Sequence, residues 1–237
     1  MIVGERKPLD EIWEFVQGYR RLLVVGCGGC VTVCLAGGEA EVKTVASALR
    51  IAARRERCQQ EILEDCVTRQ CEPEFVEALR ARVAGEGIDA VLSLACGVGV
   101  NFLAERLGDV PVFPGINTRF LGAAVEAGVW VEMCAGCGNC MLHLTGGICP
   151  VARCSKSILN GPCGGSNGGK CEISPDLDCA WALILERMKR LGTLDRLLEV
   201  TPPRDWSTSR HGGPRRTVRE DVRELAVDSK NRTVVPS

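Results

Sequence analysis

The sequence has 237 residues, of which 25% are charged and 4% are aromatic, and its formal net charge is −1 at pH 7. This balance excludes the basic surface and the aromatic stacking platform that nucleic-acid-binding proteins use. No apolar run approaches the roughly 18 residues that a membrane-spanning helix requires, so we expect no membrane span. The length has room for one large domain or two small ones.

The first half of the chain alternates predicted helices with apolar strands. Helices are expected over residues 9–20 and 39–57, from 73 to about 83, and after the glycines at 97–99 to about 107. Strands are expected over 21–26, 61–68, 89–95 and 110–113. This order predicts an α/β fold in which residues 1–130 form a doubly wound domain around a parallel sheet.

Five cysteines follow the predicted strands. Cys27, Cys30 and Cys34 follow the first strand, Cys71 follows the second and Cys96 follows the third. Because the carboxyl ends of parallel strands meet at one edge of a sheet, these thiols are expected to converge there. We predict a [4Fe–4S] site that uses four of the five and is built first on Cys30, Cys71 and Cys96. The alternative is that Cys27 and Cys96 are small buried hydrophobic residues.

Two other features of this half are not expected to form a site. Cys58 lies late in a charged helix and Cys66 lies inside a strand, so both are expected to be plain thiols. The turn after the first strand has cysteines where a dinucleotide-binding fold keeps the glycines of GxGxxG. We therefore predict no nucleotide cofactor.

The second half contains a cysteine block, with eight of the fifteen cysteines between residues 134 and 179. They are Cys134, Cys137, Cys140, Cys149, Cys154, Cys163, Cys171 and Cys179. The first three are spaced CxxCxxC and Cys149 precedes a proline, a pattern typical of [4Fe–4S] sites, and two such clusters need eight thiolates. Glycines throughout the block let backbone N–H groups turn toward cluster sulfurs. Four-thiolate zinc, zinc beside one cluster, and disulfides are the alternatives.

We predict that Cys134, Cys137 and Cys140 hold one cluster, with a fourth ligand drawn from the cysteines at 149–179, and that the rest form a second site. His143 lies inside the block and is an alternative ligand, although a surface position or support of a ligand suits it better. With the site at the strand ends, the chain is predicted to hold two or three [4Fe–4S] clusters, or zinc in place of one.

After the block, residues 180–191 predict a helix that ends at Gly192, and a further turn or two over 194–200 completes a cysteine-rich domain at 131–200. Residues 201–237 have no periodic apolar face and predict an extended tail. Trp206 is costly to leave in water, so we expect Trp206 and residues 212–216 to pack on a partner. Ending the chain after Val200 is therefore expected to leave the clusters intact.

Five segments resemble the MetV family, also known as the C-terminal domain of methylenetetrahydrofolate reductase. They are GCGGCVTVCLAGGE from residue 26, RQCEPEF at 69–75, LSLACGVGV at 92–100, the cysteine-rich stretch at 145–172 and CAWALILERMKRLG at 179–192. The resemblance covers about residues 20–215, and the NGPCGG…GKCE block is specific to it. It implies metal binding by all fifteen cysteines except Cys58 and Cys66.

The resemblance also implies a partner and a function. Members of the family accompany the flavin-containing reductase subunit of acetogens and other anaerobes, whose TIM barrel carries the flavin and the folate site. Electrons would pass between an external donor, such as ferredoxin or a larger redox complex, and that flavin, which reduces 5,10-methylene- to 5-methyl-tetrahydrofolate. The tail would then pack on the flavin subunit.

The residues themselves predict metal binding rather than catalysis. The two histidines show no nucleophile–base pattern and no carboxylate pair stands out, so no catalytic residue is predicted. The first residues mix charges of both signs without an apolar signal, and such a cysteine-rich chain is expected in a reducing cytoplasm. A zinc-dependent methyltransferase and a structural zinc subunit of the same complex are the alternative functions.

Overall fold

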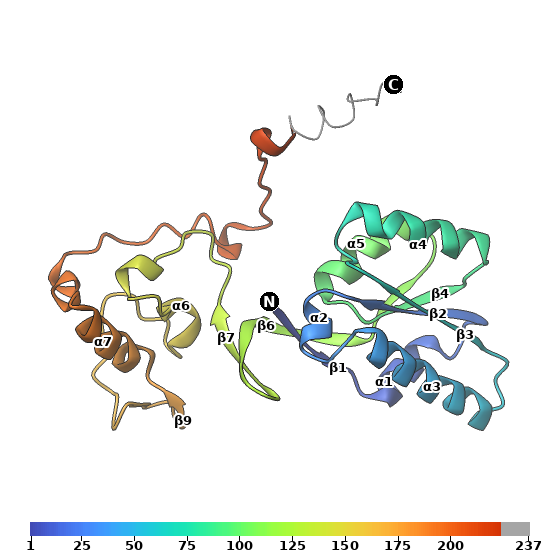
Figure 1. Ribbon diagram of the computed structural model, residues 1–237, viewed down its shortest axis with the longest axis horizontal. Coiled ribbons are helices and arrows are strands. Elements are labelled where there is room, and N and C mark those ends of the chain that lie inside the picture. Colours follow the sequence, from blue (N-terminus) through green and yellow to red (C-terminus); the bar gives the residue numbers. More distant parts are fainter. Residues whose placement is uncertain (224–237) are drawn as a thin grey trace, which may run out of the picture. The chain divides into compact units, whose positions relative to one another are not determined.

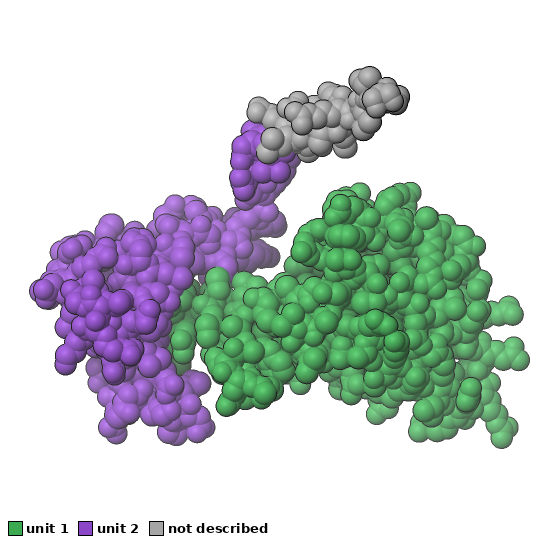
Figure 2. All heavy atoms as spheres, viewed as in Figure 1, with its two compact units in different colours: residues 1–135, 149–157 green, residues 136–148, 158–237 purple. Residues whose placement is uncertain are grey.

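The computed structural model describes residues 1–223, so the end of the predicted tail, 224–237, lies outside the described residues. The chain divides into two compact units (Figure 2). Unit 1 contains residues 1–135 and 149–157, and unit 2 contains residues 136–148 and the chain from 158 onward. The chain therefore passes between the units three times within the cysteine block. The predicted domain limits at 130 and 200 remain predictions.

Unit 1 is built on a four-stranded parallel sheet in the order β3-β2-β4-β5 (Figure 1). The strands are β2 (Arg21–Cys27), β3 (Glu61–Val67), β4 (Ala90–Ser93) and β5 (Val112–Pro114). In register, Val24 of the central strand β2 stands between Glu64 of β3 and Leu92 of β4. The predicted α/β class and parallel sheet are confirmed.

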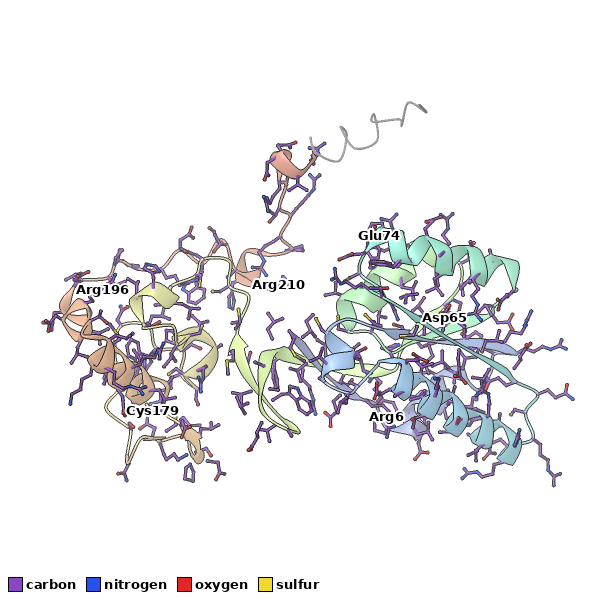
Figure 3. All side chains as sticks on the ribbon, in the orientation of Figure 1. Arg6, Asp65, Glu74, Cys179, Arg196 and Arg210 are labelled. Carbon is purple, nitrogen blue, oxygen red and sulfur yellow. The ribbon has the colours of Figure 1, made fainter. Side chains whose placement is uncertain are left out.

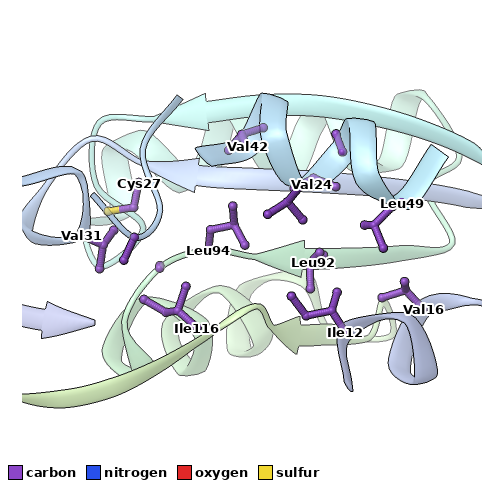
Figure 4. Close-up of a cluster of buried hydrophobic side chains, with 14 of the residues drawn as sticks. Ile12, Val16, Val24, Cys27, Val31, Val42, Leu49, Leu92, Leu94 and Ile116 are labelled. Atoms are coloured by element: carbon purple, nitrogen blue, oxygen red, sulfur yellow. The ribbon is translucent and has the colours of Figure 1, made fainter. Parts of the chain in front are cut away.

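Helices cover both faces of this sheet, as a near-continuous apolar strand such as β2 requires. They are α1 (Leu9–Val16) and α3 (Glu39–Arg55) on one face, and α4 (Pro73–Gly85) and α5 (Gly97–Leu107) on the other. Leu22 and Val24 belong to the cluster with α1 and α3, in which Figure 4 labels Val24, while Leu23 and Val25 pack in the cluster with α4 and α5. The short helix α2 (Cys30–Val33) follows β2 directly.

Two predicted helix limits differ from the structure by more than two residues. The first helix ends at Val16 rather than residue 20. Helix α5 begins at Gly97, so the glycines predicted as a turn lie in its first turn. A Cβ at Gly99 would stand 2.7 Å from the Cβ of Ala95 and 3.0 Å from that of Gln70. Gly99 is therefore explained by the close approach of its neighbours, and not by a turn.

Unit 1 also contains an antiparallel sheet that the sequence did not predict. Its order is β1-β6-β7, formed by β1 (Ile2–Arg6), β6 (Ile116–Glu126) and β7 (Val129–Cys134). Most of β6 and β7 is exposed, so packing imposes little apolar alternation on their sequences. The short helix α6 (Pro150–Arg153) packs against β7 in the same unit.

Unit 2 has little regular structure. It contains η1 (Leu142–Leu144), the hairpin of β8 (Lys170–Cys171) and β9 (Ser174–Asp178), α7 (Ala180–Leu191), η2 (Leu194–Leu198) and η3 (Arg210–Gly212). The predicted helix α7 is confirmed and ends at Gly192, whose φ of 67° is left-handed. It buries Trp181, Ile184 and Met188, and the Trp181 indole donates to the carbonyl of Ile158 at 2.8 Å.

No helix formed by residues 1–223 is both long enough and apolar enough to cross a membrane.

Candidate metal centres

Four predicted ligands lie at the carboxyl edge of the parallel sheet. Cys27 ends β2, Cys30 begins α2, Cys71 lies in the loop after β3 and Cys96 is the residue before α5. Because β2 pairs with both β3 and β4, the loops that carry these cysteines are neighbours. Cys27 and Cys96 are buried, Cys30 is half-buried and Cys71 is exposed.

The thiols of this edge act on one another electrostatically. Neighbouring atoms desolvate the sulfur of Cys71 and raise its pKa, and negative charge on Cys27 and Cys96 raises it further. The Arg69 guanidinium donates to Glu72 at 2.5 Å, which raises the pKa of Arg69, and charge on Cys71 and Cys30 adds to this effect. Four thiols and the Arg69–Glu72 ion pair therefore share this edge.

Cys66 lies closer to this group than its sequence position indicated. Burial raises the pKa of the Cys66 thiol, and negative charge on Cys27 raises it further. Its sulfur occupies the space over Gly26, its partner in register, where a Cβ would stand 3.0 Å away. The glycine in β2 is thus the one sequence signal for this proximity. The expectation that Cys66 is a plain thiol stays a prediction.

Cys34, the fifth cysteine of this region, has its sulfur against strand β1. The N–H of Gly4 donates to this sulfur at 3.3 Å, and the thiol contacts the carbonyls of Val31 at 3.6 Å and Gly4 at 3.7 Å. Cys34 is 5% exposed and belongs to the apolar cluster beneath α3. Its contacts are those of a packed core thiol.

Gln70 is a supporting residue that sequence reasoning missed. Its side chain is fully buried, and its amide nitrogen donates to the carbonyls of Val25 and Gly26 at 3.0 Å each. Its amide oxygen accepts from the hydroxyl of Ser93 at 2.6 Å. Gln70 thereby joins the ends of β2 and β4 and positions the next residue, Cys71. The sequence signal for this bridging role is weak: Gln70 directly precedes Cys71 in the loop after a predicted strand.

We expect replacement of Gln70 by alanine to lower the free energy of unfolding by at least the roughly 1–3 kcal/mol that a buried polar group costs when it loses its partner. Two carbonyls and the Ser93 hydroxyl would each lose one hydrogen bond, although the Val25 carbonyl would keep its bond from the N–H of Leu94 at 2.8 Å. Urea titration measures the change, and Gln59→Ala, at an exposed position, is the control. Equal stability of the two variants would contradict the bridging role.

The eight cysteines of the block are divided between the units. Unit 1 holds Cys134 at the end of β7, and Cys149 and Cys154 at the two ends of α6. Because α6 packs against β7, these three belong to one local structure. Unit 2 holds Cys137, Cys140, Cys163, Cys171 and Cys179. The predicted grouping of Cys134 with Cys137 and Cys140 remains a prediction.

Backbone turns and the β8-β9 hairpin present the later cysteines of unit 2. The sulfur of Cys163 accepts from the N–H of Gly165 at 3.5 Å and contacts a carboxylate oxygen of Glu172 at 3.8 Å. Cys171 ends β8, and Cys179 is the residue before α7, labelled in Figure 3. The N–H of Cys179 donates to the carbonyl of Gly169 at 2.8 Å.

The described part of the tail folds back onto the loop around Cys137. Arg204 donates to the sulfur of Cys137 at 2.9 Å and also to the carbonyl of Asn139. Thr208 donates to the Cys137 carbonyl at 3.1 Å, and Arg215 donates to the Gly136 carbonyl at 2.6 Å. The loop therefore depends on donors that lie some 70 residues later, which no local sequence pattern could reveal.

His143 lies beside a cavity rather than in a group of ligands. The cavity of about 390 Å³ is lined by Cys140, His143, Leu144 and residues 201–205 among others. A neighbouring cavity of about 630 Å³ shares part of this lining and reaches Trp181 on α7. Whether His143 supports a ligand stays a prediction.

The chemistry of the donors fits a thiolate-bound metal centre. All fifteen cysteines lie in the described part of the chain. Within residues 1–223, no three side chains of His, Cys, Asp or Glu are grouped as ligands of one metal ion. Thiolates around one zinc ion stand about 3.8 Å apart, since Zn–S is about 2.3 Å in a tetrahedron. A four-iron cluster takes one thiolate per iron and holds them farther apart.

One comparison relates this region to known proteins. A family model described as "Methylene-tetrahydrofolate reductase C terminal" matches residues 113–207. The matched segment contains all eight cysteines of the block and also Arg204. It is therefore similar to a C-terminal domain of methylene-tetrahydrofolate reductase. No curated protein and no solved structure matches the chain.

Proposed function

We propose that this chain is an iron–sulfur electron-transfer subunit of a methylenetetrahydrofolate reductase complex. It would pass electrons between an external donor, ferredoxin or a larger redox complex, and the flavin of the catalytic subunit. The observation that carries the proposal is that the family match at 113–207 encloses the entire cysteine block. A segment similar to a domain of this reductase thus coincides with the chain's densest set of predicted metal ligands.

In unit 1, we assign one cluster to Cys27, Cys30, Cys71 and Cys96. Burial of Cys27 and Cys96 limits the access of water to this edge, and the Gln70 amide fixes the strand ends around it. Arg69, which forms an ion pair with Glu72, interacts electrostatically with Cys71 and Cys30. Cys34 is left out because its sulfur already contacts the backbone of β1. The cysteine block has eight thiolates, enough for two further clusters.

Bound clusters would supply one-electron chemistry, and the chain itself would hold, shield and orient them. Burial, nearby charge and hydrogen bonds to sulfur set the potential of such centres. The described residues offer each of these: the buried edge of the sheet, the cations Arg69 and Arg204, and N–H groups of glycine-rich turns such as that of Gly165.

The test is metal analysis of protein purified without oxygen. We expect about eight to twelve irons per chain with matching sulfide, and a broad brown absorption that dithionite bleaches. Cys58→Ala, at an exposed cysteine assigned to no site, is the control and should keep the full count. Zinc without iron would overturn the proposal, and methyl-transfer assays would then separate a zinc methyltransferase from a structural zinc subunit.

A further inference from the structure

The contact between Arg204 and Cys137 joins a cation directly to the sulfur of a predicted ligand. The guanidinium donates to this sulfur at 2.9 Å and lies over the ring of Trp206, 4.9 Å from its centroid. Within residues 1–223 no carboxylate forms an ion pair with Arg204, and its buried Nε has no hydrogen-bond partner. The neighbouring Asp205 instead accepts from the N–H and hydroxyl of Ser207. The positive charge of Arg204 is therefore directed at Cys137.

The loop that carries Cys137 has a fixed shape in unit 2. Gly136 and Gly138, on either side of the cysteine, have left-handed φ values of 59° and 84°. A Cβ at Gly138 would collide with the carbonyl of Thr208. Arg215, Thr208 and Arg204 donate to the carbonyls of residues 136, 137 and 139. The direction of the Cys137 sulfur is thus held by the tail.

Arg204 and Arg215 make different contacts with the loop that carries Cys137. Within residues 1–223, Arg215 donates to the carbonyl oxygens of Gly136 and Thr208 and to no sulfur, so it supports the loop by backbone contacts. Arg204 bonds both a carbonyl and the sulfur. A cation beside a cluster's ligand stabilises the reduced, more negative state of the cluster.

We propose that Arg204 is a positioning residue for the metal centre held by Cys137, and that its guanidinium, fixed against the cysteine sulfur by Trp206, raises the reduction potential of that centre. This inference rests on the proposed iron–sulfur function. It concerns which charge tunes the centre, and not whether the chain carries clusters.

The test compares three variants by iron content and by redox titration followed with electron paramagnetic resonance. Arg204→Gln should keep its iron and show a lower midpoint potential, while Arg204→Lys, which retains the charge, should stay close to the wild-type value. Arg215→Gln, which removes a bond to the same loop but no contact with the sulfur, is the matched control and should shift the potential less than Arg204→Gln. The signal missing from Cys137→Ala identifies which centre is being measured.

Each outcome of this comparison either supports or overturns the proposed role of Arg204. An unshifted potential in Arg204→Gln, or an equal shift in Arg215→Gln, overturns the tuning role. If Arg204→Gln loses iron, full iron in Arg204→Lys supports the need for a cation at the sulfur, and loss in both variants shows a purely structural role and overturns the proposal. Wild-type protein without iron instead rejects the proposed function.

Discussion

Replacement of Cys96 by alanine is expected to remove about four irons per chain, whereas replacement of Cys34 by alanine should leave the iron count unchanged. Cys96 precedes α5 at the carboxyl edge of the sheet, where its charge acts on Cys71. Cys34 follows the same strand as Cys27 and is equally buried, but its sulfur contacts the backbone of Gly4. The two variants therefore remove similar side chains with different assigned roles.

Iron and sulfide analysis, with the intensity of the visible absorption, measures this difference. Alanine at either position removes only one sulfur from the core, so both proteins should remain folded, and circular dichroism checks this. Loss of iron in Cys34→Ala with full iron in Cys96→Ala would contradict the assignment. It would place Cys34 among the ligands and Cys96 among the packed thiols.

The centre of the parallel sheet could be predicted because β2 and β4 are buried on both faces. Burial on both faces requires apolar runs such as the one from Leu22 to Val25, and a turn that carries cysteine follows β2 and β4. The position of Cys27, Cys71 and Cys96 at one edge follows from the order of parallel strands. The antiparallel sheet could not be read in this way, since the side chains of β6 and β7 lie largely in solvent.

The support of the sites could not be predicted, because it comes from residues distant in sequence. In the sequence, Gln70 is a polar residue of a predicted loop. The structure shows that its side chain bonds residues of both β2 and β4. In the sequence, Arg204 belongs to a predicted extended tail. The structure shows that its guanidinium donates to the sulfur of Cys137. Cysteine spacing predicts candidate ligands, whereas the hydrogen bonds to those side chains depend on tertiary structure.

The contacts of the tail with the Cys137 loop change the expected effect of truncation on the metal content. The sequence predicts an extended segment whose loss leaves the clusters intact, but Arg204, Thr208 and Arg215 supply the donors that hold the Cys137 loop. A glycine-rich metal-binding loop has little core of its own, so losing these donors should cost it its metal.

Ending the chain after Val200 is therefore expected to remove about four irons, the same number as Cys137→Ala, and also to abolish co-purification with the flavin subunit. Ending the chain after Thr217 keeps residues 204–215, which include Trp206, and should preserve both the iron content and the co-purification. Iron analysis and co-purification measure the two effects. Cys137→Ala separates them, because it loses the metal but retains the tail and should still bind the flavin subunit. Full iron and normal binding after truncation at Val200 would show that residues beyond it neither support the Cys137 loop nor form the docking surface.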